Sequence, residues 1–314
     1  MTGNTTINSD YWRKYHDAGT VERGDALRQT FSITSTGVRI HMDVYEQPDK
    51  NAPVFIFNHG GGGYSRLFIP MGLAMFDLGY TVIFPDQRGQ GLSEGDRGDY
   101  TVAQCLQNIL DAARWARQRY TGPVFMGGGS LGGGLTYYAA AAGAPVNAVV
   151  LHNLYDFGNG KDGLAFTRVP VLSHVPGIPA ISKLTMRLLT GLVPRLRISN
   201  RLLSPFENMV DPRAIGFYDL WSKDPYPIKT LSVRSIGSLM NTPPAVPFEK
   251  NTIPALVINQ KRDRMVSPSV TRRNYERLGG PKQYMEIDYG HWAMGEAFIQ
   301  EWTGIVHTYL SQFR

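Results

Sequence analysis

The sequence predicts an α/β fold, with a mostly parallel sheet covered by helices on both faces. Short, continuous apolar runs recur along the chain, which is typical of strands that are buried on both faces. Helical stretches separate these runs, and strands that alternate with helices form parallel sheets. The 314 residues are enough for one large domain with a well-buried core, or for a core domain with an insertion.

The chain begins with a polar segment, and we expect residues 1–25 to form an N-terminal extension. This segment has no apolar core of signal-peptide length. Residues 31–33 and 38–45 then alternate apolar and polar side chains around a Thr36-Gly37 turn. This pattern predicts an antiparallel hairpin.

The buried strands and their helices follow the hairpin. The clearest helix begins at Thr101, a residue type that caps helix N-termini, and stops before Gly122-Pro123. An apolar stripe along one side of this helix predicts that it packs on the sheet. The continuous apolar runs that predict strands are residues 54–57, 80–84, 124–126, 148–151 and 255–258.

One interval breaks the alternation of strands and helices. About a hundred residues separate Leu151 from Ala255, far more than one crossover connection needs. The interval holds more than half of the 20 prolines and a helical stripe over residues 181–193. We therefore expect an insertion over residues 157–250, folded over one edge of a core made of residues 26–156 and 251–314.

The charge and the cysteine content exclude several classes of protein. The chain has 32 Lys plus Arg and 26 Asp plus Glu, a net charge of +6, and the whole excess lies between residues 161 and 250. These basic residues are spread singly among apolar ones, which is a poor pattern for binding nucleic acid. The single cysteine, Cys105, cannot form an intramolecular disulfide, and no apolar run reaches the length of a membrane span. We expect a cytoplasmic protein that needs neither a metal ion nor a nucleotide cofactor.

A glycine-rich turn carries the candidate nucleophile. Gly128, Ser130 and Gly132 match the pattern G-x-S-x-G, between the strand at 124–126 and a helical stretch at 135–142. Strand, sharp turn and helix in this order hold a serine at a strained position with its hydroxyl exposed. The small flanking residues let the turn close, and the helix N-terminus favours an anion beside the serine.

The candidate base and its orienting carboxylate follow later in the chain. His291 comes after a predicted last strand at residues 283–287, in a loop that contains Gly290. Asp263 lies just beyond the strand at 255–258, where a carboxylate can hold the imidazole in the required tautomer. Asp156, which follows the preceding strand, is the alternative to Asp263.

The candidate oxyanion hole is a second glycine-rich loop. Four glycines follow Asn58-His59 after a buried strand, and they leave backbone N–H groups uncovered by side chains. We expect the N–H groups of Leu131 and Gly61 to bind the oxyanion, with Gly62 as the second choice for the loop. The candidate substrate-binding residues are Gly62, His152, Leu184, Leu188 and Trp292, and the two leucines are placed in a roof over the site.

The order Ser130, Asp263, His291, with a glycine loop upstream, resembles that of the α/β-hydrolase superfamily over residues 31–313 outside the insertion. His59-Gly60-Gly61-Gly62 and the pattern D-x-R-G-x-G-x-S at residues 86–93 are similar to the monoacylglycerol lipase and lysophospholipase group. This resemblance implies a mostly parallel eight-stranded sheet and a lid, or cap, inserted between strands 6 and 7. The insertion here is longer and richer in proline, and Gly129 stands where that group often has histidine.

The function expected from these residues is that of a serine hydrolase. It would cleave a small-molecule carboxylic ester or lactone with an apolar acyl or alcohol part, through an acyl-enzyme. Amidase, carbon–carbon hydrolase and perhydrolase activities are alternatives because they use the same triad. A non-catalytic ligand-binding protein of this fold is a further alternative. The basic insertion with its leucine stripe also suggests a weak contact with a membrane surface.

Overall fold

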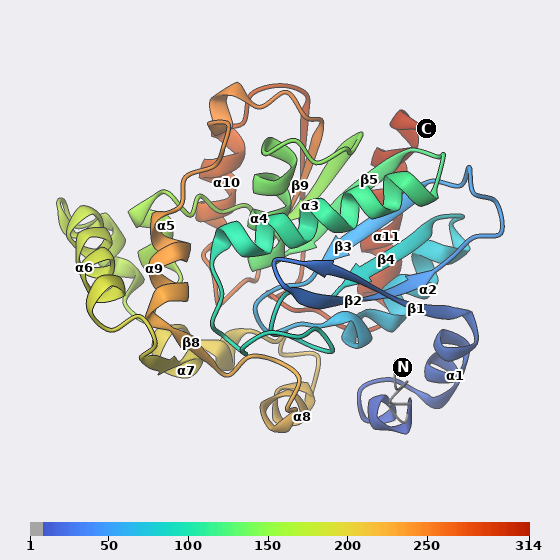
Figure 1. The fold of residues 1–314 in the computed structure, drawn as a ribbon, viewed down its shortest axis with the longest axis horizontal. Coiled ribbons are helices and arrows are strands. Elements are labelled where there is room, and N and C mark those ends of the chain that lie inside the picture. Colours follow the sequence, from blue (N-terminus) through green and yellow to red (C-terminus); the bar gives the residue numbers. More distant parts are fainter. Residues whose placement is uncertain (1–8) are drawn as a thin grey trace.

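The computed structural model describes residues 9–314, and one eight-stranded sheet forms its centre (Figure 1). The strand order is β1-β2-β4-β3-β5-β6-β9-β10. The pairs β1–β2 and β2–β4 are antiparallel, and all other neighbours in this sheet are parallel. The predicted α/β class and mostly parallel sheet are therefore confirmed. The strands are β1 Arg28–Ser35, β2 Val38–Tyr45, β3 Val54–Asn58, β4 Thr81–Pro85, β5 Val124–Gly129, β6 Ala148–His152, β9 Ala255–Gln260 and β10 Lys282–Ile287.

Helices cover both faces of the sheet, which explains why the central strands are apolar throughout. Val54 and Ile56 of β3 pack in one layer with α3, α4 and α10, whereas Phe55 and Phe57 pack in the other with α2 and α11. Each strand therefore buries both of its sides, as the continuous apolar runs predicted. These helices are α2 Ile69–Asp77, α3 Val102–Arg119, α4 Leu131–Ala141, α10 Pro268–Arg277 and α11 Glu296–Leu310.

The predicted hairpin and the predicted first long helix are both present. Thr36 and Gly37 join β1 to β2 with φ angles of 48° and 76°, the left-handed conformation that two-residue hairpin turns require. Thr101 caps α3 by accepting a hydrogen bond from the backbone N–H of Gln104, whose side chain in turn bonds to the Thr101 backbone.

A long excursion of the chain separates β6 from β9, the sixth and seventh strands of the sheet (Figure 1). We refer to residues 157–250 as the insertion. Its outermost element is α6, which packs on α9 and α5 at one end of the molecule. Its helices and its small antiparallel sheet are α5 Gly160–Ala165, α6 Ile178–Leu192, β7 Arg197–Ser199, α7 Asn200–Leu203, α8 Phe217–Lys223, β8 Thr230–Ser232 and α9 Val233–Asn241.

The N-terminal segment packs against the core. Residues 1–8 of the predicted extension lie outside the described residues, and helix α1, Ala18–Leu27, runs across the predicted boundary at residue 25 directly into β1. Trp12 is buried, with its ring 4.7 Å from the guanidinium of Arg66. Over residues 9–314, no helix combines the length and the apolar character needed to cross a membrane.

Candidate active site

Ser130 sits at the sharp turn between β5 and α4. Its φ of 54° and ψ of −126° are strained for a residue with a side chain. The turn closes tightly: a Cβ on Gly132 would lie 2.0 Å from the carbonyl oxygen of Asn58, and one on Gly128 would lie 2.3 Å from that of Gly132. The two glycines of the motif are therefore required by the backbone, and Ser130 stands at the N-terminus of α4.

His291 and Asp263 come together with Ser130. The Nε2 atom of His291 lies 2.9 Å from the Ser130 Oγ, and its Nδ1 atom lies 2.7 Å from Oδ2 of Asp263. The other carboxylate oxygen of Asp263 accepts hydrogen bonds from the backbone N–H groups of Met265 (2.9 Å) and Val266 (2.8 Å). Because a carboxylate accepts from Nδ1–H, the Nε2 lone pair is left to accept the serine proton.

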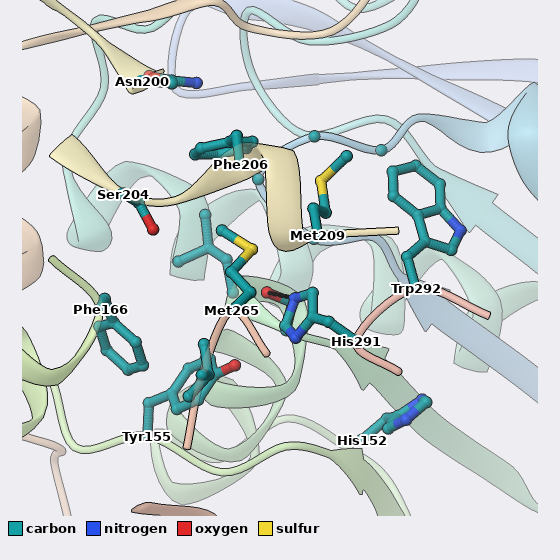
Figure 2. A pocket seen from close by; sticks show the side chains of 18 of the residues that line it. His152, Tyr155, Phe166, Asn200, Ser204, Phe206, Met209, Met265, His291 and Trp292 are labelled. Atoms are coloured by element: carbon teal, nitrogen blue, oxygen red, sulfur yellow. Dashed lines mark hydrogen bonds between the residues drawn. The ribbon is translucent and has the colours of Figure 1, made fainter. Parts of the chain in front are cut away.

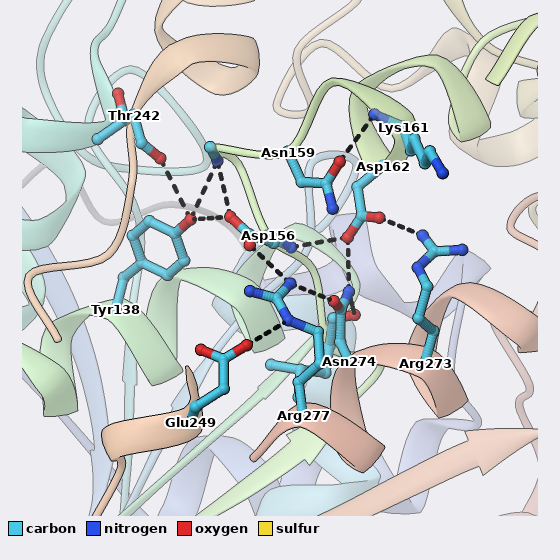
Figure 3. A network of polar contacts seen from close by, with 12 residues as sticks. Tyr138, Asp156, Asn159, Lys161, Asp162, Thr242, Glu249, Arg273, Asn274 and Arg277 are labelled. Atoms are coloured by element: carbon cyan, nitrogen blue, oxygen red, sulfur yellow. Dashed lines mark hydrogen bonds and ion pairs between the residues drawn. The ribbon is translucent and has the colours of Figure 1, made fainter. Parts of the chain in front are cut away.

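The alternative carboxylate, Asp156, is engaged elsewhere. It accepts a 2.8 Å hydrogen bond from the guanidinium of Arg277 and a 3.2 Å hydrogen bond from the hydroxyl of Tyr138 (Figure 3). Arg277 also pairs with Glu249, so this network ties the two ends of the insertion to α10. Asp263, and not Asp156, is the carboxylate bonded to His291.

The glycine loop after β3 lies against Ser130. A Cβ on Gly60 would be 3.0 Å from the Ser130 Cβ, and one on Gly61 would be 3.5 Å from the Leu131 side chain. His59 fixes the start of the loop, since its Nε2 accepts from the N–H of Gln87 (3.0 Å) and its Nδ1 then donates to the Gly60 carbonyl (2.8 Å). Burial lowers the pKa of His59, which keeps its ring neutral.

The D-x-R-G-x-G-x-S segment supports the same loop. Asp86 accepts hydrogen bonds from the backbone N–H groups of Ser65 (2.6 Å) and Leu92 (2.7 Å). The side chain of Gln87 donates to the His59 carbonyl at 2.6 Å. From the sequence, this segment is only a point of resemblance to a known family. The contacts of Asp86 and Gln87 show that it also holds the glycine loop in place.

An apolar cavity of about 260 Å³ opens beside Ser130 and His291 (Figure 2). Gly62, His152 and Trp292, three of the predicted substrate-binding residues, lie in its wall. The ring of Trp292 stacks on Phe68 with 5.8 Å between ring centroids. Burial, followed by the proximity of His291, lowers the pKa of His152 to about 4, so this imidazole is neutral near pH 7.

The predictions for Leu184 and Leu188 are wrong. Neither residue lines the cavity, and their side chains are 57% and 60% exposed on the outer side of α6. The partly buried side of α6 includes Met186 and Thr190, and Thr190 packs so closely on α9 that a Cβ on Gly237 would lie 2.1 Å from the Thr190 hydroxyl. The insertion lines the cavity with other side chains, among them Phe166, Leu203, Phe206, Leu231, Ile236 and Met240.

A family model and a protein of Escherichia coli each match most of this chain. The family model described as serine aminopeptidase, S33, matches residues 49–292. An uncharacterized 31.7 kDa protein in the traX-finO intergenic region of Escherichia coli is 25% identical over 283 residues, covering 87% of this chain and 95% of that protein.

Two solved lipases have a similar fold. The monoacylglycerol lipase of Paleococcus ferrophilus has 19% sequence identity and a TM-score of 0.67, over 88% of this chain and 99% of the lipase. A soluble variant of the monoglyceride lipase from Saccharomyces cerevisiae, solved with a substrate analogue, has 15% identity and a TM-score of 0.65, over 91% and 97% of the two chains.

Proposed function

The chain belongs to the serine aminopeptidase S33 family of hydrolases, and we propose that it is a serine hydrolase of carboxylic esters or lactones. The observation that carries the proposal is the hydrogen-bonded series Asp263, His291 and Ser130 at the mouth of an apolar cavity. Ser130 lies 161 residues from His291 in the chain, and the three groups are aligned as nucleophilic catalysis requires.

The chemistry follows from the positions of these groups. The Ser130 Oγ attacks the ester carbonyl while Nε2 of His291 accepts its proton, and Asp263 stabilises the resulting imidazolium. The N–H groups of Leu131 and Gly61 would bind the oxyanion of the tetrahedral intermediate. His291 then protonates the departing alcohol, and water hydrolyses the acyl-enzyme by the same steps in reverse roles.

The cavity wall favours an ester over a peptide substrate. Of the described residues that line it, none is Asp, Glu, Lys or Arg. An aminopeptidase must bind the positively charged amino terminus of its substrate, and burying an unpaired ammonium group in an apolar cavity is costly. We therefore propose a substrate with an uncharged, apolar acyl or alcohol part, in preference to a peptide with a charged amino terminus.

A substrate panel tests this proposal. We expect turnover of p-nitrophenyl esters to rise with acyl length until the cavity is filled, and to exceed that of the matched p-nitroanilides and aminoacyl anilides. Ser130→Ala is the control and should abolish turnover. Hydrolysis that survives in Ser130→Ala, or a preference for aminoacyl anilides, would contradict the proposal.

The outer surface of α6 supports a second proposal about where the enzyme acts. Ile181, Leu184, Leu188 and Leu192 form one exposed stripe, with Leu192 78% exposed. Other exposed apolar residues of the insertion are Val171, Leu196 and Leu202. A row of exposed apolar side chains along one helix is typical of an interaction site.

We propose that this stripe contacts an anionic membrane surface. The exposed Arg187 and Arg195 lie on α6 and just beyond it, within the segment that carries the entire +6 charge excess. This charge attracts anionic lipid head groups and repels a second copy of the same face. Such a contact would bring the cavity close to lipophilic esters.

A further inference from the structure

A buried carboxylate outside the candidate catalytic triad joins three separate segments of the chain. Asp224, at the end of α8, is only 2% exposed. It accepts hydrogen bonds from the hydroxyls of Tyr11 (2.9 Å), Tyr15 (2.7 Å) and Tyr64 (2.7 Å), and from the backbone N–H of Tyr226 (3.0 Å). A buried carboxylate needs such donors because it has lost its water.

The three tyrosines come from two segments that are distant in the chain. Tyr11 and Tyr15 belong to the N-terminal segment, whereas Tyr64 directly follows the glycine loop. Trp12 adds a further link by donating from Nε1 to the Tyr64 hydroxyl at 3.0 Å. Burial, reinforced by Asp224, raises the pKa of both Tyr15 and Tyr64, so these hydroxyls keep their protons and remain donors.

Helix α8 also contacts the glycine loop directly. Trp221 donates from Nε1 to the carbonyl oxygen of Gly62 at 2.7 Å. Its ring stacks on Phe206 with a centroid distance of 5.7 Å, and a Cβ on Gly62 would lie 3.0 Å from Trp221. The insertion therefore makes two hydrogen bonds at the glycine loop. Trp221 bonds to the Gly62 carbonyl, and Asp224 bonds to the hydroxyl of Tyr64, the residue after the loop.

The contact with Trp221 adds to the hydrogen bonds that hold the Gly60 end of the glycine loop. Consecutive glycines permit a peptide unit to rotate at low cost. Within the loop, the Gly60 carbonyl accepts hydrogen bonds from the N–H of Gly63 at 3.0 Å and from Nδ1 of His59 at 2.8 Å. Trp221 bonds to the Gly62 carbonyl, which belongs to the same peptide unit as the Gly63 N–H. It therefore holds the donor that orients the Gly60–Gly61 peptide unit beside Ser130.

We propose that Trp221 and Asp224 are positioning residues that hold the glycine loop in its oxyanion-binding conformation. Residues 11–15 of the N-terminal segment hold Asp224 in place through Tyr11 and Tyr15. We call this set of contacts the clamp. The inference rests on the proposed esterase function, since it assigns the loop its role in that reaction. The matched family model begins at residue 49, so Tyr11 and Tyr15 lie outside the part of the chain that it covers.

The variant Trp221→Phe tests the clamp because it keeps an aromatic side chain at this buried position and removes the N–H donor together with part of the indole ring. We expect kcat for a p-nitrophenyl ester to fall about tenfold or more with KM changed less than threefold, because an oxyanion contact acts mainly in the transition state. Affinity for a trifluoromethyl ketone, which forms an oxyanion on Ser130, should fall in proportion to kcat/KM. Tyr218→Phe on the same helix is the matched control and should leave all three quantities unchanged.

Unchanged kcat and unchanged ketone affinity in a folded Trp221→Phe protein would overturn the inference. If that variant does not fold, the pair Tyr11→Phe and Tyr15→Phe decides instead, with a smaller loss of kcat expected and no loss overturning it. Failure of the proposed function is distinguishable, because the wild-type protein would then lack Ser130-dependent turnover. Hydrogen exchange at residues 61–64 would still report on the clamp: faster exchange in the variants supports it, and equal exchange overturns it.

Discussion

Ser130 keeps its strained backbone because Gly128 and Gly132 have no side chains that would collide with the backbone of the turn. The positive φ of 54° at Ser130 and the close approach of Gly132 to the Asn58 carbonyl are features of the same tight turn between β5 and α4. Strain of this kind persists only where the surroundings enforce it, and it is typical of functional sites.

Substituting Gly132 with alanine should therefore be severe. A Cβ placed 2.0 Å from a backbone oxygen forces the turn to move, and we expect a loss of about 2–4 kcal/mol in the free energy of unfolding, with at least a hundredfold loss of ester turnover. Gly191, in the exposed outer part of α6, is the matched control. A Cβ there meets no atom within 4 Å among the described residues, so Gly191→Ala should stabilise the protein by about 0.5–1 kcal/mol. Equal effects of the two changes on a denaturant-unfolding curve would refute this account of the turn.

His152 should make the protein sensitive to acid. Its pKa is about 4 in the folded chain and 6.5 in the unfolded chain, so below pH 6.5 the unfolded state binds a proton that the folded state does not. The stability that follows from the neutral ring is complete above pH 6.5 and is lost as the pH falls towards 4. Between pH 7.5 and pH 5 the wild-type protein should lose about 2 kcal/mol more than His152→Gln. Parallel stability curves for the two proteins, measured by urea unfolding, would show that His152 does not contribute.

Single residues were predictable from the sequence where a local pattern encodes their position. Ser130 lies in a glycine motif between a strand and a helix, and Asp263 and His291 each follow a strand end, so the topology brings all three to one edge of the sheet. His59 and Trp221 act through contacts with residues distant in the chain. No local pattern reveals such contacts.

At the level of elements, the continuous apolar strands and the capped helix α3 were predictable. Burial gives an element a characteristic spacing of apolar residues, and capping places characteristic residue types at the ends of a helix. Helix α6 was predictable as a helix, but not its orientation. Its leucine stripe has the helical period that indicates a face turned towards a core, whereas Leu184 and Leu188 in fact face outward. A period of 3.6 residues identifies an apolar face and does not say what covers it.

The outward stripe predicts binding to lipid vesicles. Wild-type protein should co-sediment with phosphatidylglycerol vesicles at low salt and much less at high salt, because salt screens the basic residues. The triple variant Leu184→Ser, Leu188→Ser, Leu192→Ser should bind weakly, whereas Met285→Ser, a control at the exposed edge strand β10, should bind normally. Turnover of a soluble short-chain ester should be equal in all of them, because α6 does not line the cavity.

Two results would contradict the membrane contact. One is an absence of vesicle binding by the wild-type protein even at low salt. The other is a stable dimer in light scattering that the triple leucine variant dissociates, since the stripe would then be covered by a second copy.

For the molecule as a whole, charge and apolar surface are unevenly distributed. The basic excess lies between residues 161 and 250, whereas the rest of the chain has equal numbers of acidic and basic residues. The cavity is lined by uncharged aromatic and aliphatic side chains from both the core and the insertion. This division suits a protein that attracts an anionic surface on its outside and takes up an uncharged group inside.

Every catalytic role proposed for this chain requires Ser130 to be an activated nucleophile. Reaction of the folded protein with a fluorophosphonate, followed by mass spectrometry of the intact chain and of its peptides, tests that dependence. We predict a single adduct on the peptide that contains Ser130, no adduct in Ser130→Ala, and much slower labelling in His291→Gln. A folded wild-type protein that does not react, or labelling that persists in Ser130→Ala, would contradict the account.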